Sequence, residues 1–215
     1  MLIKNCTISV EVPISAANTI SGYGIRVNQI NDPVVERNTV TINAPNSSAA
    51  ESEGITISGT DATATALRGI VRYNTVTVNA PACRGIAIAS DGTTTSETDD
   101  AEVYGNRVYG GFYDGSSTPH GISIGDCLRG RVYSNYVQGF AAGILLSENQ
   151  DTATGAIVSG NVVYGAPYAG IFLKGNANAT VVNNTVIQDS SVVGANFGAY
   201  GMIGIAAQTG NNLLS

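Results

Sequence analysis

The chain has 215 residues, and its composition of 43% hydrophobic and 12% charged residues is typical of a globular protein rather than a disordered one. A formal net charge of -6 argues against a nucleic acid partner, because such binding depends on Lys and Arg that neutralise phosphates. The longest apolar run, 140–146, is too short to span a bilayer, so we expect no membrane insertion.

The first half of the chain contains two nearly identical segments, ERNTVTINAP at 36–45 and VRYNTVTVNAP at 71–81. With their Asn as an anchor, the pattern recurs along the chain at intervals of 23 to 36 residues. The anchors are Asn38, Asn74, Asn106, Asn135, Asn161 and Asn184, with Cys6 at the same place in the first repeat. The positions three residues before them hold Ile3, Val35, Val71, Val103, Val132, Val158 and Val181. The positions two residues after them hold Ile8, Val40, Val76, Val108, Val137, Val163 and Val186.

A second anchor, the pair Gly-Ile, recurs between the Asn anchors. Its glycines are Gly24, Gly54, Gly85, Gly121, Gly143, Gly170 and Gly204. Two residues beyond each Ile another apolar residue follows, except for the smaller Ala207 in the last repeat. This alternation with a period of two predicts short strands with one buried face and one free face.

Each repeat therefore predicts one coil of three short strands, with the anchor Asn in the tight turn between the second and third strands. Stacked coils lie about 4.8 Å apart, so aligned Ile and Val side chains would fill a continuous core while Asn side chains form a hydrogen-bonded ladder. The expected fold class is all-β: a right-handed parallel β-helix, a solenoid of about seven coils with three parallel sheets. It forms a single domain, 1–215.

The predicted coil is open at both ends of the chain. The sequence begins inside a coil and shows no amphipathic capping helix, whereas native solenoids usually cover their exposed strand edges. We therefore expect a fragment or subunit of a larger assembly, or else an atypical capping coil at each end. The first residues also lack the pattern of a secretory signal peptide, so any export must be specified elsewhere or follow cell lysis.

The repeat resembles that of the pectin-lyase-like superfamily of parallel β-helices, which includes pectate and alginate lyases, uronan epimerases, polygalacturonases and phage tailspikes. The resemblance covers essentially the whole chain. It implies an extracellular or virion-associated protein that acts on polysaccharides. It is specific for the fold and poor for the reaction, because these families place different chemistry on the same solenoid.

Tyrosines are frequent on the outward positions of the middle coils. Those before the Asn anchors are Tyr73, Tyr104 and Tyr133, and those after them are Tyr109, Tyr136 and Tyr164. Tyr rings beside polar neighbours such as Arg107 suit the apolar faces and polar edges of sugars. We expect a substrate-binding surface formed by Tyr104, Tyr133, Tyr109, Tyr136 and Arg107. The alternative is that these aromatic residues only stabilise the strands.

Other outward positions predict packing rather than chemistry. Glu36 should align with Arg72, and Glu102 with Arg131, as solvated ion pairs between coils. Leu145 and Phe172 should form an apolar spot on the outer face of the first strands, which favours a homo-oligomer, most simply a trimer. The same face offers almost no oxygen ligands, so we expect no metal and no other cofactor, although the acidic segment 91–100 leaves calcium as an alternative.

The only histidine suggests a first catalytic site. His120 directly precedes a Gly anchor, and the equivalent positions of the two preceding coils hold Arg84 and Glu53, with Asp114 nearby in sequence. Arg and His suit a uronan lyase or epimerase, which needs a cation for the substrate carboxylate and a base for the C5 proton. The uronan epimerases carry Asp-Pro-His where this chain has Thr-Pro-His at 118–120. The alternative is a polar turn residue.

Two carboxylates suggest a second catalytic site. Asp126 and Glu148 each stand five residues after a Gly anchor on adjacent coils. Stacking would bring their carboxyl groups near the separation of about 5 to 5.5 Å found in retaining glycosidases, or somewhat wider as in inverting ones. They would then be the acid and the nucleophile or base of a hydrolase. The alternative is a pair of acidic residues that face water at turns.

Two classes of function follow from these patterns. In the first, the chain binds and depolymerises an extracellular polysaccharide. In the second, it is a structural or adhesive solenoid without catalysis. The cysteines Cys6, Cys83 and Cys127 cannot all pair and lack metal-binding spacing, so they leave the redox compartment open.

Overall fold

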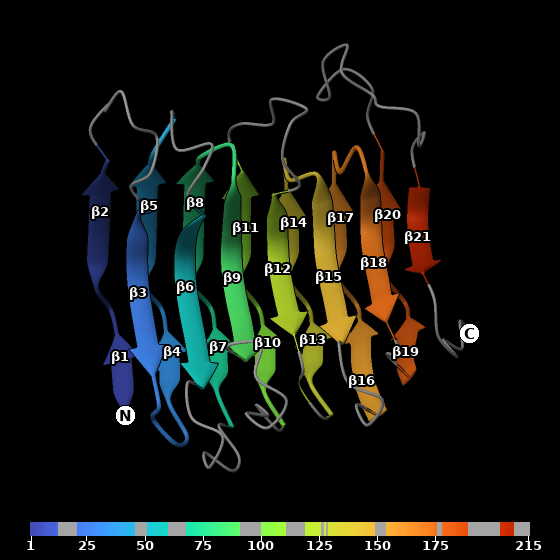
Figure 1. Ribbon diagram of the computed structural model, residues 1–215, viewed down its shortest axis with the longest axis horizontal. Coiled ribbons are helices and arrows are strands. Elements are labelled where there is room, and N and C mark those ends of the chain that lie inside the picture. Colours follow the sequence, from blue (N-terminus) through green and yellow to red (C-terminus); the bar gives the residue numbers. More distant parts are fainter. Residues whose placement is uncertain are drawn as a thin grey trace.

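The repeats fold into three parallel sheets, each of seven strands, in a computed structural model (Figure 1). The structure describes residues 1–12, 21–45, 51–59, 68–90, 100–110, 119–125, 127, 129–148, 154–175, 178–188 and 203–208. Successive strands of the chain pass from one sheet to the next, and every pairing is parallel. The predicted parallel β-helix of about seven coils is therefore confirmed.

The sheets are named by the order in which the chain first enters them. Sheet A contains β1 (Leu2–Lys4), β4 (Val34–Glu36), β7 (Ile70–Arg72), β10 (Glu102–Tyr104), β13 (Arg131–Tyr133), β16 (Thr154–Ser159) and β19 (Asn178–Val182). Sheet B contains β2 (Thr7–Glu11), β5 (Thr39–Asn43), β8 (Thr75–Asn79), β11 (Arg107–Gly110), β14 (Tyr136–Gln138), β17 (Val162–Tyr164) and β20 (Thr185–Ile187). Sheet C contains β3 (Tyr23–Asn28), β6 (Ser52–Gly59), β9 (Cys83–Ser90), β12 (His120–Gly125), β15 (Ala142–Glu148), β18 (Ala169–Gly175) and β21 (Ile203–Gln208).

The core is the stack of β-branched residues that the anchors predict. Val71, Val103 and Val132 pair in register across sheet A and are completely buried. Ile86, Ile122 and Ile144 do the same across sheet C. Because every coil presents the same apolar positions to the interior, the core continues along the axis of the solenoid.

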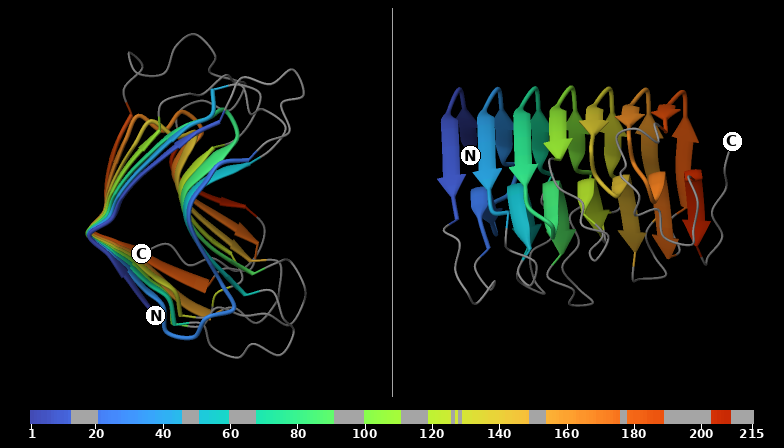
Figure 2. Two further views of the ribbon diagram at one scale, coloured as in Figure 1. Left: turned by 90° about the vertical axis from the view of Figure 1, so that its left-hand side faces the viewer. Right: turned by 90° about the horizontal axis from the view of Figure 1, so that it is seen from above.

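The turn between sheets A and B is always two residues long, and its second residue is the anchor Asn in six of the seven coils. The residue before several anchors, such as Arg37, Tyr73 and Ser134, has a φ between 54° and 56°, in the left-handed region. This backbone produces the sharp corner where sheets A and B meet in the view along the axis (Figure 2). All longer connections of the chain lie before or after a strand of sheet C.

The anchor Asn side chains form the predicted ladder at this corner. Asn106 Oδ1 accepts hydrogen bonds from the backbone N and the Nδ2 of Asn74, at 2.9 and 3.0 Å. Asn106 Nδ2 donates to the Val71 carbonyl at 2.9 Å and to Asn135 Oδ1 at 3.0 Å. The same bonds repeat at neighbouring coils, so these buried amides satisfy the backbone groups that the turn leaves unpaired.

The Gly of the second anchor is required by close packing between sheets. A Cβ at Gly121 would overlap Val137 Cγ1 and lie 2.6 Å from the carbonyl oxygen of Gly143. Gly85 faces Val108 and the carbonyl oxygen of Gly121 in the same way. Glycine therefore lets the start of these sheet C strands approach the sheet B strand of the next coil.

Candidate functional site

The outer face of sheet C carries the predicted row of Glu53, Arg84 and His120. Glu53 on β6 pairs with Arg84 on β9, and Arg84 pairs with His120 on β12, so the expected alignment is confirmed. The same row continues with Ala142 on β15 and Ala169 on β18. Polar side chains therefore gather on the N-terminal half of this face.

Arg84 is held between two carboxylates. Its Nε lies 2.7 Å from Glu51 Oε1, an ion pair rather than an aligned hydrogen bond, and its Nη1 lies 3.6 Å from Glu53 Oε1. Glu53 Oε2 also accepts a hydrogen bond of 2.6 Å from Thr56 Oγ1. Glu51 was not among the candidate residues predicted from the sequence. Its spacing of two from Glu53 could have indicated it, because residues two apart point to the same side of a strand.

The environment changes the acidity of two members of this cluster. Burial raises the pKa of Glu51, and the charge of Glu53 raises it further, while Arg84 opposes both effects. The Glu51 side chain nevertheless keeps 41% of its surface exposed, so solvent moderates the shift. Burial lowers the pKa of His120 to about 4, helped by the positive charges of Arg84 and Lys174. The imidazole is therefore neutral at pH 7.

His120 also has an unused hydrogen-bonding atom. Its Nδ1 is buried and has no hydrogen-bond partner among the described residues. A buried polar atom without a partner costs free energy, so such an atom often marks the place of a ligand or a water molecule.

The uronan lyase hypothesis finds little support in this geometry. Arg84 already forms ion pairs with Glu51 and Glu53, so it is not free to bind a substrate carboxylate. A His120 with a pKa of about 4 is a weak base for removing a C5 proton. Asp114 and Asp126 lie outside the described residues, and of Glu148 only the backbone is described, at the end of β15.

The C-terminal half of the same face is apolar and aromatic. Leu145 and Phe172 pair in register, and the Phe172 ring meets the Tyr168 ring edge to face at 5.3 Å. The expectation that Leu145 and Phe172 leave apolar surface exposed is wrong, since they keep only 7% and 8% of their surface. Tyr168, Ala169 and Ala206 pack around them, which explains their burial.

The outer face of sheet A carries one pair of the predicted tyrosines. The rings of Tyr104 and Tyr133 stack in parallel, 4.7 Å apart and 8° from coplanar. Tyr73 lies outside their column. It is in the turn, and Arg72 takes the place in register with Tyr104. Its ring contacts Tyr104 edge to face at 5.4 Å, so Tyr104 lies between two rings.

The other predicted tyrosines lie on sheet B. Arg107 is in register with Tyr136, and the Tyr109 and Tyr136 rings are tilted at 5.9 Å. Tyr136 Oη donates to Gln138 Oε1 at 2.9 Å. Sheets A and B turn away from each other at the sharp corner (Figure 2), so the two tyrosine pairs occupy different faces rather than one surface.

The predicted pairing of charges between coils is confirmed in part. Arg72 forms an ion pair with Glu36 at 2.6 Å, but Glu36 is buried rather than solvated. Glu102 is in register with Arg131 without an ion pair between the two, and its Oε2 accepts a hydrogen bond from Tyr133 Oη at 3.2 Å. The structure therefore uses the Glu102 carboxylate to hold a tyrosine.

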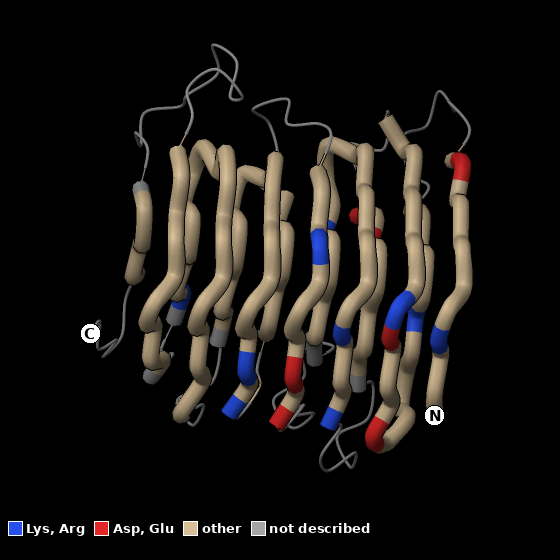
Figure 3. Tube along the Cα trace, turned by 180° about the vertical axis from the view of Figure 1, so that it is seen from behind, with Lys and Arg blue, Asp and Glu red and all other residues tan. Residues whose placement is uncertain are grey.

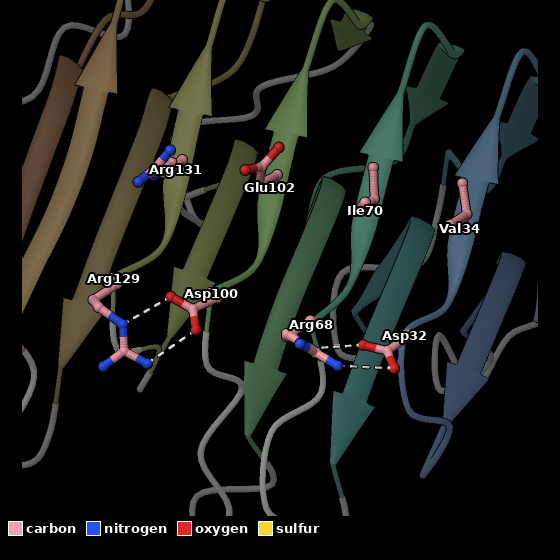
Figure 4. A pocket seen from close by; sticks show the side chains of 8 residues that line it. All are labelled: Asp32, Val34, Arg68, Ile70, Asp100, Glu102, Arg129 and Arg131. Atoms are coloured by element: carbon pink, nitrogen blue, oxygen red, sulfur yellow. Dashed lines mark hydrogen bonds and ion pairs between the residues drawn. The ribbon is translucent and has the colours of Figure 1, made fainter.

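A pocket of about 510 Å³ lies on the outer face of sheet A (Figure 4). Two ion pairs border it, Asp32 with Arg68 and Asp100 with Arg129, each with N to O distances between 2.7 and 3.2 Å. Acidic and basic residues alternate along this border of the sheet (Figure 3). Because these four charges pair with each other, the border is nearly neutral and offers little to an ionic ligand.

Neither a membrane span nor a metal centre is evident in the part of the chain that the structure describes. It contains no helix long and apolar enough to cross a membrane. Within the same residues, no three His, Cys, Asp or Glu side chains gather where they could hold a metal ion.

Comparison with known proteins supports the fold. A family model described as "Right handed beta helix region" matches residues 1–186. Neither a curated protein nor a solved structure matches the chain. The comparison therefore adds the hand of the coil to the observed parallel β-helix and names no substrate.

Proposed function

Because this chain belongs to the right-handed β-helix family, we propose that it binds an extracellular polysaccharide along the outer face of sheet C. It would then be part of an extracellular or virion-associated protein that binds this polysaccharide and has the groups to cleave it. The supporting observation is that one continuous face joins the polar row Glu53, Arg84 and His120 to the cluster around Tyr168. Sugars have polar edges and apolar faces, so this combination suits them.

The long connections of the chain also favour this face. They all flank sheet C in chain order, whereas the turns between sheets A and B have two residues. Insertions on one side of a solenoid usually form its binding wall. The tyrosines of sheet A are less suited, because Tyr104 is already covered by Tyr73 and Tyr133.

The test is binding to a panel of bacterial capsular polysaccharides and uronans. Arg84→Gln should weaken binding to any polysaccharide that the unmutated chain retains, because Arg84 holds the polar row in place. Arg37→Gln is the matched control, since the Arg37 side chain is 62% exposed in a turn away from sheet C. If Tyr104→Ala or Tyr133→Ala abolishes binding and Arg84→Gln does not, the site is on sheet A. Binding to no member of the panel would contradict the proposal.

A second candidate is a structural or adhesive solenoid that assembles with other subunits. The observation that favours it is Ile205, which is 42% exposed although it continues the interior column of the completely buried Ile171. Exposed interior positions at an outer coil are suited to stacking against another coil or subunit. A homo-oligomer, such as the expected trimer, would appear in sedimentation measurements, and a stable monomer at micromolar concentration would contradict it.

A further inference from the structure

The charges on the outer face of sheet A change sign from one coil to the next (Figure 3). In each of four successive coils, the strand and the residue two positions before it contribute two charges of the same sign. These pairs are Asp32 and Glu36, then Arg68 and Arg72, then Asp100 and Glu102, and finally Arg129 and Arg131. Along the solenoid axis the four coils therefore carry charges of -2, +2, -2 and +2, which sum to zero.

Contacts within one chain use only part of this charge. The two ion pairs at the border of the pocket keep 45% to 61% of their side chains exposed, so they add little to the stability of the chain. Arg131 is exposed and in register with Glu102, but it forms no ion pair or hydrogen bond with another described residue. It lines the pocket together with the apolar Val34 and Ile70 (Figure 4). This side of the solenoid therefore has charge available for a partner.

The spacing of the charges identifies the kind of partner. Neighbouring strands of a sheet lie about 4.8 Å apart, so the sign changes at that interval along this face. Side chains on one side of an extended peptide lie roughly 6.6 Å apart and would lose register with the coils. A charge that sums to zero also gives no net attraction to a polyanion or a polycation. The partner that fits is another stack of coils with the same alternation, which a second copy of this chain provides.

We propose that two copies associate face to face through sheet A with their solenoid axes antiparallel, about a two-fold axis between the coils of Arg68 and Asp100. The order of charges then faces its own reverse, so each of the four coils meets a coil of opposite charge. The other described charges near this face, Lys4 and Arg37, meet uncharged residues. Parallel axes, or a shift by one coil, would place like charges opposite each other. The pattern therefore specifies both the direction and the register of the dimer.

The same arrangement gives Arg131 its missing partners. Arg131 of the second copy would enter the pocket over Val34, between Asp32 and Glu36 of the same coil. By the same symmetry, Glu102 of the second copy would lie between the two arginines of the next coil. The outer face of sheet C stays uncovered, so the dimer is independent of the polysaccharide binding proposed above. It also differs from stacking at an outer coil, because it uses the side of the solenoid rather than its end.

The experiment is a charge swap followed by sedimentation. The unmutated chain should dimerise at low salt and dissociate at high salt, because the Debye length falls from about 30 Å at 0.01 M to about 3 Å at 1 M. Asp32→Arg and Arg129→Asp should each abolish the dimer, since the introduced charge meets a like charge of the second copy. An equimolar mixture of the two variants should restore it, because both facing pairs then have opposite charges. Glu11→Arg is the matched control, an equal change of charge at an exposed residue of sheet B.

The Asp32 and Arg129 side chains are 56% and 53% exposed, so both variants should fold, and circular dichroism checks this. Recovery of the dimer in the mixture cannot come from misfolded protein. A monomer at every protein concentration at low salt would overturn the inference. So would self-association that neither variant changes, which would place the contact elsewhere, such as at the exposed Ile205. Loss of the dimer in both variants without recovery in the mixture would also overturn it.

Discussion

Replacing Asn106 by Ala should be one of the most destabilising changes at the corner between sheets A and B. The Asn106 side chain is almost completely buried, and its Oδ1 is the acceptor for the backbone N–H of Asn74. An orphaned buried N–H costs about 1 to 3 kcal/mol, and each further lost hydrogen bond costs about 1 kcal/mol. The further losses are the bonds to Asn74 Nδ2, the Val71 and Tyr104 carbonyls and Asn135 Oδ1. We therefore expect a loss of about 5 kcal/mol or more.

The assay is urea unfolding followed by circular dichroism, with Asn79→Ala as the control. Asn79 ends strand β8, is half-buried, and its Nδ2 donates one hydrogen bond of 2.7 Å to Asn43 Oδ1. Its replacement should cost about 1 kcal/mol or less. If Asn106→Ala were no more destabilising than Asn79→Ala, the ladder would not carry the stability that its geometry indicates.

Three more outcomes are expected. Gly121→Ala should destabilise the protein by about 2 kcal/mol or more in thermal unfolding. Gly125→Ala should be tolerated, because its Cβ would meet Ser147 Oγ only at 3.4 Å, and equal effects of the two changes would contradict close packing at Gly121. A thiol reagent should label exposed Cys6 rapidly and Cys83 only after unfolding, because burial raises the Cys83 pKa to about 12; fast labelling of both refutes this. The single histidine signal in NMR should titrate near pH 4, and a midpoint near 6.5 would contradict the burial of His120. Because the unfolded chain takes up this proton near pH 6.5, the free energy of unfolding should fall as the pH drops from 6.5 to 4, and it should fall less in His120→Gln.

Much of the fold can be predicted from the sequence, because a solenoid repeats one local rule. Each coil needs β-branched residues at interior positions, an amide at the corner and a glycine where two sheets approach. These needs leave columns such as Val71, Val103 and Val132 that are visible without a structure. For the same reason, the register of Glu53, Arg84 and His120 could be predicted from their distance to the Gly anchors.

The solenoid, its interior and the identity of the outward columns thus follow from the amino-acid pattern alone, since strand alternation and coil stacking depend only on local spacing. Which outward residues contact one another depends on the folded arrangement of the three sheets. It separated Tyr104 from Tyr109 by the corner between sheets A and B, and it buried Phe172 beneath its neighbours. It also joined Glu51 to Arg84, because contacts on a face depend on the length and direction of side chains from adjacent coils, which no repeat pattern records.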